Sequence, residues 1–171
     1  MILKQQILKE NSKSNTVKIA DYIADDPDKF EELISLFLGN DYRVTQRASA
    51  VVSLCTSNHP QLITPHLKKV ILNLKKDVNT AVKRNTVRLL QDIDIPNKLL
   101  GEAADICFKF LESKQEPIAV KAFSMTVLAN ICKKEPDLKR ELQILIEDQL
   151  PTGSAGFKNR GNKVLKQIEN Y

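Results

Sequence analysis

The stretch TAVKRNTVRLLQDI, residues 80–93, has the periodicity of an amphipathic helix. Lys83, Arg84 and Arg88 lie beside an apolar stripe, so the helix has one apolar face and one basic edge. The residues of the stripe are spaced i, i+4, i+7, i+8 and i+11, which places them on one face of an α-helix: Val82, Thr86, Leu89, Leu90 and Ile93.

The same stripe recurs at a nearly constant separation along the chain. One copy lies 38 residues earlier, one lies 38 residues later and a last one follows after another 37 residues. The second position of every copy is small, which allows another helix to cross closely there. The three further copies are Val44, Ala48, Val51, Val52 and Cys55, then Val120, Ser124, Val127, Leu128 and Ile131, then Phe157, Gly161, Val164, Leu165 and Ile168.

Four partner helices alternate with these stripes, and each is predicted to open at a proline. Proline suits the first helical position because it has no N–H to lose there and its φ is already helical. The prolines are Pro27, Pro60, Pro96 and Pro136. The partner stripes are Phe30, Leu33, Ile34 and Phe37, then Leu67, Val70, Ile71 and Leu74, then Leu99, Ala103, Ile106 and Phe110, then Leu138, Leu142 and Leu145.

Repetition at a constant period favours stacked helix pairs over a closed helical bundle. We predict an all-α fold, a right-handed α–α superhelix (an α-solenoid) of helical hairpins in a single domain, residues 1–171. Residues 14–27, SNTVKIADYIADDP, resemble the second helices and predict an atypical first repeat that caps the stack. The expected divisions are a cap over residues 1–26 and repeats over about 27–57, 58–94, 95–134 and 135–171.

The hairpins resemble HEAT and armadillo-like repeats from about residue 14 to residue 171. NHPQLITPHLKKVILNL, residues 58–74, looks like a HEAT first helix with a second proline inside it. AVKRNTVRLL, residues 81–90, looks like a second helix, with a valine followed by a base. Lys83, Lys121 and Lys158 occupy that basic position, and Thr45 departs from it. The resemblance implies a scaffold for interactions, and the overall layout is similar to small stand-alone bacterial HEAT-like proteins without an established activity.

One loop resembles part of an enzyme superfamily. Some of those small relatives carry an adenylosuccinate-lyase name, and residues 153–162, GSAGFKNRGN, superficially resemble the flexible signature loop of that superfamily. Gly153, Ser154 and Asn162 match the signature, whereas Arg160 replaces its lysine. A structural interpretation explains the same segment: Ser154 caps a helix, and the stripe of residues 157–168 begins there. We predict a non-catalytic protein and keep the lyase as a remote alternative.

Composition and cysteine usage restrict the class of protein. The N-terminus MILKQQILKENSKSN has too short an apolar run for a signal peptide. No window of the sequence approaches the ~18 apolar residues that a membrane helix needs. Cys55, Cys107 and Cys132 are odd in number, widely spaced and without a C-x-x-C pair, which indicates a reduced compartment with buried thiols. We therefore expect a cytoplasmic protein that does not associate with membranes.

The usual motifs for metals, cofactors and nucleophiles are missing from the sequence. His59 and His66 are the only histidines and have no further ligand at a suitable spacing, so we predict no metal site. The glycines of residues 153–161 lack the G-K-[ST] ending of a phosphate-binding loop, and we predict no cofactor. Acidic residues such as Glu31 and Glu32 lie near a helix N-terminus, where the helix dipole accounts for them.

Charge is divided unevenly between the two kinds of helix. The predicted first helices carry ten basic and ten acidic residues, whereas the predicted second helices carry twelve basic and three acidic residues. In HEAT-like solenoids second helices line the concave side. We therefore predict that this surface binds an acidic segment of a protein partner, through Arg43, Arg47, Lys83, Arg84, Arg88, Lys121, Lys158, Arg160 and Lys163.

Nucleic-acid binding is the alternative function, since the HEAT-like alkylpurine DNA glycosylases combine a basic concave face with aromatic residues. This chain has no tryptophan, and only Tyr22, Tyr42 and Phe123 lie near second helices. Platforms for stacking bases are therefore few.

Overall fold

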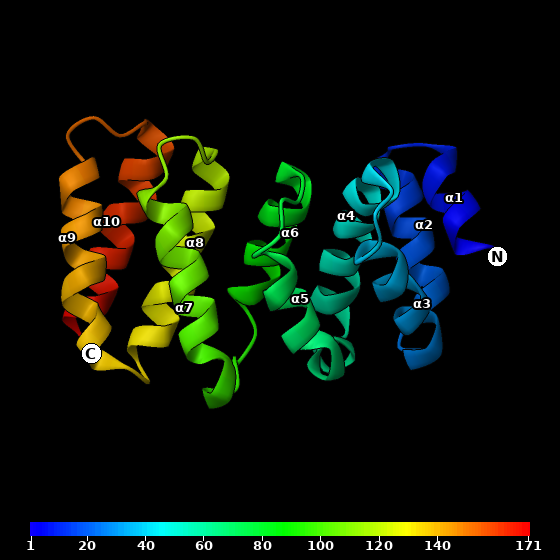
Figure 1. Cartoon of the computed structure of the whole chain (residues 1–171), viewed down its shortest axis with the longest axis horizontal. Coiled ribbons are helices and arrows are strands. Elements are labelled where there is room, and N and C mark those ends of the chain that lie inside the picture. The colour runs from blue at the N-terminus through cyan, green and yellow to red at the C-terminus, as the bar shows by residue number, and fades with distance from the viewer. The chain divides into compact units, whose positions relative to one another are not determined.

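The computed structural model describes all 171 residues and consists of helices joined by short loops, with no strand. The chain divides into two compact units, Met1–Asp92 and Ile93–Tyr171. Within each unit successive helices lie side by side (Figure 1). The predicted all-α fold class is therefore confirmed.

The N-terminal unit contains six α-helices and one 3₁₀ helix. Helix α4 lies at its centre and packs against α1, α2, α3 and α6. Since α2 and α6 both pack on α4, consecutive second helices are neighbours. The bounds are α1 Leu3–Lys9, α2 Lys13–Ile23, α3 Pro27–Phe37, α4 Tyr42–Asn58, the 3₁₀ helix η1 Pro60–His66, α5 Leu67–Asn73 and α6 Thr80–Leu90.

The C-terminal unit contains four α-helices and a short 3₁₀ helix. Helix α8 packs against α7, α9 and α10, so the second helices α8 and α10 are again neighbours. The bounds are α7 Asn97–Glu112, α8 Ile118–Cys132, the 3₁₀ helix η2 Pro136–Leu138, α9 Lys139–Gln149 and α10 Ala155–Glu169.

Most residues of the predicted stripes form the cores of both units. The last partner stripe differs, because Leu138 and Leu145 are half-buried and Ile146 is buried beside Leu142. The stripe residues of α4, α6 and α8 are buried, except that the predicted stripe residue Ile93 lies after the end of α6 and is half-buried. In α10 only Leu165 is half-buried.

Gly161, the small residue at the second position of the last stripe, lies where two helices cross closely. A Cβ placed there would lie 3.0 Å from Cγ2 of Ile146 and 3.2 Å from Cδ2 of Leu150, so α9 approaches α10 closely at this glycine.

Several helices begin at a side-chain cap. Asp41 Oδ1 accepts hydrogen bonds from the backbone N–H groups of Arg43 and Val44 at the start of α4. Asn79 Oδ1 accepts from Val82 N at the start of α6. The predicted cap at Ser154 is confirmed, because its Oγ accepts from Phe157 N at 3.2 Å. These caps satisfy backbone donors that have no partner in the first turn.

Two partner helices begin differently from the prediction. Pro60 and Pro136 open 3₁₀ helices, and the α-helices α5 and α9 begin only after them. Pro65 explains why η1 is not an α-helix. It has no N–H to donate to the carbonyl four residues earlier, and in an α-helix its ring would collide with that carbonyl. The backbone therefore keeps i to i−3 bonding, as from Leu62 N to His59 O, until the proline is passed.

Candidate functional site

The uneven division of charge persists when the helices are bounded as the structure has them. The second helices carry ten basic residues, two on α4, three on α6, one on α8 and four on α10, and a single acidic one, Glu169. The first helices (α3, η1 with α5, α7, and η2 with α9) carry seven basic and ten acidic residues. The excess of positive charge therefore belongs to the second helices.

Three of the nine predicted binding residues are engaged in holding the fold. Arg47 on α4 donates to the carbonyls of Ile7 and Leu8, at 3.2 and 2.9 Å, and so ties the end of α1 to the unit. Lys121 on α8 is buried, and its ammonium donates to Oε1 of Gln149 at 2.8 Å. Arg160 on α10 is half-buried and donates to the Thr126 hydroxyl. These three contribute less free charge to a binding surface than the sequence suggests.

The burial of Lys121 changes its acidity. Loss of hydration lowers the pKa of its ammonium group, against a smaller opposing effect from Glu116. Its hydrogen-bond acceptor, Gln149, is neutral, so the hydrogen bond itself supplies no opposite charge.

Five of the nine predicted residues are exposed, and Lys83 is half-buried. In the N-terminal unit the exposed ones are Arg43 on α4 and the pair Arg84 and Arg88 on α6, which lie four residues apart on one face of that helix. In the C-terminal unit Lys158 and Lys163 are exposed on α10.

Two polar pairs, one of them fully buried, join α4 and α6. Asn85 Nδ2 donates to Ser49 Oγ at 2.8 Å, and both residues are buried. One turn away, Asn79 Nδ2 donates to Thr45 Oγ1 at 3.1 Å. Neither helix contains an acidic residue, although the exposed Asp41 caps α4, and the exposed cations of α4 and α6 lie on the surface of two neighbouring helices. We call this surface, with Arg43, Arg84 and Arg88 as its exposed cations, the α4–α6 face.

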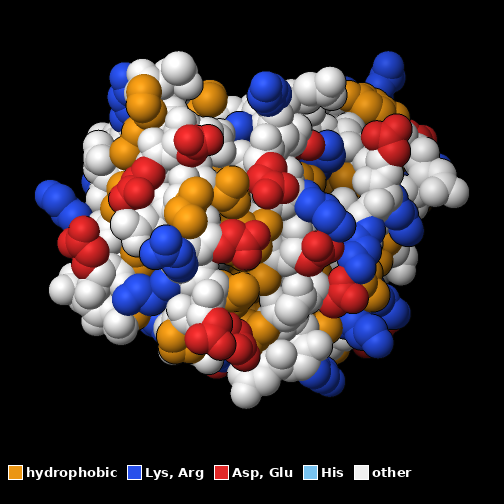
Figure 2. All heavy atoms as spheres, turned by 60° about the vertical axis from the view of Figure 1, so that its left-hand side comes forward, with side chains coloured by type: hydrophobic (Ala, Val, Ile, Leu, Met, Phe, Trp, Pro, Cys, Tyr) orange, Lys and Arg blue, Asp and Glu red, His pale blue; other side chains and the backbone are white.

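Other parts of the surface are mixed in charge. Figure 2, in which the α9 and α10 end of the chain comes forward, shows Asp and Glu side chains interspersed with Lys and Arg. Some of these charges pair locally, as Lys109 does with Asp105 at 2.9 Å on α7. Interspersed charge of this kind is typical of a solvated surface.

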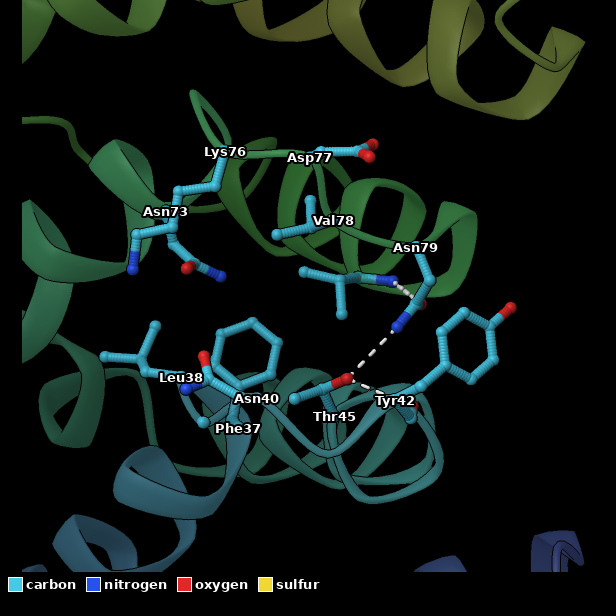
Figure 3. A pocket seen from close by; sticks show the side chains of 12 residues that line it. Phe37, Leu38, Asn40, Tyr42, Thr45, Asn73, Lys76, Asp77, Val78 and Asn79 are labelled. Carbon is cyan, nitrogen blue, oxygen red and sulfur yellow. Dashed lines mark hydrogen bonds between the residues drawn. The ribbon is translucent and has the colours of Figure 1, made fainter.

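A small pocket of about 190 Å³ lies in the N-terminal unit, where α3 and α5 end and α4 and α6 begin (Figure 3). Its lining includes Phe37, Val78 and Val82, which are apolar, together with the polar side chains of Asn73 and Lys76. Asn73 is 5% exposed. Asn73 is not among the residues predicted from the sequence to form a site, although an asparagine between the buried residues Ile71 and Leu74 is a signal for one.

A larger pocket of about 620 Å³ lies in the C-terminal unit, and Lys121, Gly153, Ser154 and Phe157 are among its lining residues. The segment that resembles the lyase loop therefore borders a pocket. Its residues have structural roles there. A Cβ at Gly153 would come within 2.8 Å of the Phe157 ring, and Phe157 is buried in the core.

The cysteines are buried, as predicted. Burial raises the pKa of Cys55 and Cys107 to about 12 and that of Cys132 to about 11. At neutral pH almost none of each thiol is present as the nucleophilic thiolate.

His66 is buried against Phe30, with ring centroids 5.8 Å apart. Loss of hydration lowers its pKa, which favours the neutral ring. It therefore acts as a core side chain.

The family of the chain follows from a comparison with known protein families. The HEAT repeat domain matches residues 3–168, so this chain belongs to the HEAT repeat family. That family generally provides scaffolds for interactions with other proteins. No curated protein and no solved structure matches the chain. None of its helices combines the length and the apolar character required to cross a bilayer.

Proposed function

We propose that the chain is a non-catalytic interaction module that binds an acidic segment of a protein partner through the exposed cations of its second helices. The observation that carries the proposal is the α4–α6 face, where two adjacent helices expose Arg43, Arg84 and Arg88 and contain no acidic residue. Membership of the HEAT repeat family supports an interaction role.

Arginine suits this task because its planar guanidinium can hold a carboxylate through two parallel hydrogen bonds. A single exposed ion pair contributes only about 0.2–1 kcal/mol, so affinity requires several pairs formed together. Arg84 and Arg88 lie on one face of α6, and Arg43 lies on the neighbouring helix, which allows one extended segment to meet more than one cation. Binding should weaken with salt, because exposed charges are screened.

A labelled glutamate-rich peptide tests the proposal, with the same peptide carrying glutamine in place of glutamate as its control. The test variant is Arg84→Glu with Arg88→Glu. The matched control is Lys68→Glu with Lys69→Glu, which reverses two exposed charges on the first helix α5 of the same unit. By fluorescence anisotropy we expect the test variant to bind at least about tenfold more weakly than wild type, and the control to change affinity by less than about twofold.

Two outcomes would reject the proposal. Equal loss in both double variants would mean that net charge alone attracts the peptide, without a specific surface. Tighter binding of a DNA or RNA oligonucleotide than of the peptide, lost in the Arg84 and Arg88 variant, would assign the face to nucleic acid instead. Capture from cell extract with the wild type and both double variants then identifies which partners depend on the face.

A further inference from the structure

The side chain of Asn73 at the end of α5 is buried but makes no hydrogen bond within the chain. Its carboxamide can donate two hydrogen bonds and accept others. The fully buried polar atoms without a partner are Thr56 Oγ1, Thr86 Oγ1 and Ser124 Oγ, and the amide atoms of Asn73 are not among them, so this amide is open to the pocket and available to a guest. Figure 3 shows the Asn73 carboxamide directed into the pocket rather than into the core of the unit.

The polar groups around Asn73 favour a negatively charged guest. The side chain of Lys76 extends along the same wall as Asn73, and Asn40 lies on the opposite side of the pocket (Figure 3). The carboxylate of Asp77 points away from the pocket. The groups that face inward therefore include an ammonium and two amides, which can all donate hydrogen bonds, and none of them is an anion.

The rest of the pocket favours a short aliphatic stem. Phe37, Val78 and Val82 supply apolar surface, and the volume of about 190 Å³ is sufficient for one side chain. Glutamate combines two methylene groups with a carboxylate, and therefore matches both the apolar lining and the donors.

We infer that this pocket receives one glutamate side chain of the partner, with its carboxylate between Asn73 and Lys76. The inference rests on the proposed function, because it names one contact of the acidic segment that the α4–α6 face would hold. The geometry supports this link: Tyr42 and Val82, near the starts of α4 and α6, line the pocket, and Arg43 and Arg84 follow one and two residues later on the same helices.

The test is a titration of the ¹⁵N-labelled chain with N-acetylglutamate N-methylamide, followed through the side-chain NH₂ signals in NMR spectra. The uncharged probe is the corresponding glutamine derivative, and sodium chloride at equal ionic strength is the blank. We expect the glutamate derivative, and neither of the other two, to shift the Asn73 signal. The glutamate-rich peptide should shift the same signal.

Two variants test the contacts. Asn73→Leu removes the donor but places an apolar side chain in a buried site, so we expect the fold to persist and thermal stability to be kept or raised. Lys76→Glu reverses an exposed charge, and Lys68→Glu is its matched control on α5. For Asn73→Leu, binding is followed through the backbone signals of the pocket. We expect each pocket variant to weaken binding of the glutamate derivative at least about tenfold, and the control to leave it unchanged.

The outcomes separate this inference from the proposed function. If the peptide binds the wild type without moving the Asn73 signal, the glutamate pocket is rejected while the α4–α6 face stands. If the glutamate and glutamine derivatives bind equally, the site does not select a carboxylate and the inference fails. If the small derivative binds but the peptide does not, the pocket takes a free carboxylate, and both the partner segment and the proposed function are overturned.

Discussion

The ammonium group of Lys121 on α8 donates a hydrogen bond to the side-chain oxygen of Gln149 on α9, with 2.8 Å between the two atoms. The amide nitrogen of Gln149 in turn donates to the carbonyls of Leu111 and Leu145, each at 3.1 Å. One glutamine therefore joins α7, α8 and α9. The contact also explains how a lysine at a predicted binding position is buried.

Removing Gln149 should cost more stability than removing the charge of Lys121. Gln149→Leu leaves the buried ammonium without an acceptor and the Leu111 carbonyl without its donor, so we expect a loss of about 1–3 kcal/mol. Lys121→Met keeps most of the apolar stem and leaves the bonds of Gln149 to both carbonyls, so we expect a loss below about 1 kcal/mol. Urea unfolding measures both values. A costlier Lys121→Met would show that the charge itself stabilises the unit.

The stability difference between the wild type and Lys121→Met should depend on pH. Because burial lowers the pKa of Lys121 below its usual 10.5, folding disfavours the charged form. The charged Lys121 therefore destabilises the folded state. This destabilisation is fully present at pH values below the pKa of Lys121 in the folded chain, and it disappears as pH rises from that pKa to 10.5. We therefore expect the wild type to gain stability relative to Lys121→Met on going from neutral pH to pH 10.5. Urea unfolding of both proteins at a series of pH values checks this. A constant difference would mean that the pKa is unchanged by folding.

Two glycines in helices should respond oppositely to alanine. A Cβ added to Gly101 on α7 would have no neighbouring atom within 4 Å, so Gly101→Ala should stabilise by about 0.5–1 kcal/mol through helix propensity alone. Gly161 on α10 gains the same propensity, but its Cβ would press on Ile146 at 3.0 Å. Since overpacking costs about 1–3 kcal/mol, we expect Gly161→Ala to be neutral or destabilising. Thermal unfolding measures the stability of both variants. An equal gain in stability would mean that α9 shifts at little cost to accommodate the added methyl group.

The hydrogen bond between Asn85 and Ser49 should show strong coupling. Ser49→Ala leaves a buried amide without its acceptor, so we expect a loss of about 1–3 kcal/mol. Asn85→Leu removes the donor, and in the double variant no amide is left unpaired. A double-mutant cycle by urea unfolding should therefore give a coupling energy of about 1 kcal/mol or more. Additive losses would indicate that solvent replaces the bond.

The fold could be predicted from the sequence because it depends on a pattern that is local and repeated. The stripe of Val82 and Thr86 recurs at a nearly constant spacing, and the structure buries all of its copies except Ile93 and Leu165, which are half-buried. The 3₁₀ segment before α5 was missed because proline can either start a helix or interrupt one. Pro60 starts a helical segment, and Pro65, one turn later, keeps that segment from being α-helical.

The candidate site was less predictable, because a side chain's partners lie far away in the sequence. Arg47 is held by carbonyls about 40 residues before it, and Lys121 by an amide 28 residues after it. Neither partner belongs to a motif. Asn73 lies between the predicted stripe residues Ile71 and Leu74, but only the folded structure shows that its amide faces a pocket at the ends of α3 and α5.

The placement of the three thiols provides a direct measurement of how the chain opens. Cys55 belongs to the N-terminal unit, whereas Cys107 and Cys132 belong to the C-terminal unit, and all three are inaccessible in the folded state. With pKa values of about 11 to 12 they should resist iodoacetamide at pH 8 until their unit unfolds. Peptide mass mapping after brief alkylation in increasing urea should show Cys55 modified at a different urea concentration from the other two. Identical midpoints would reveal one cooperative transition, and the natural sequence needs no introduced label to distinguish the two cases.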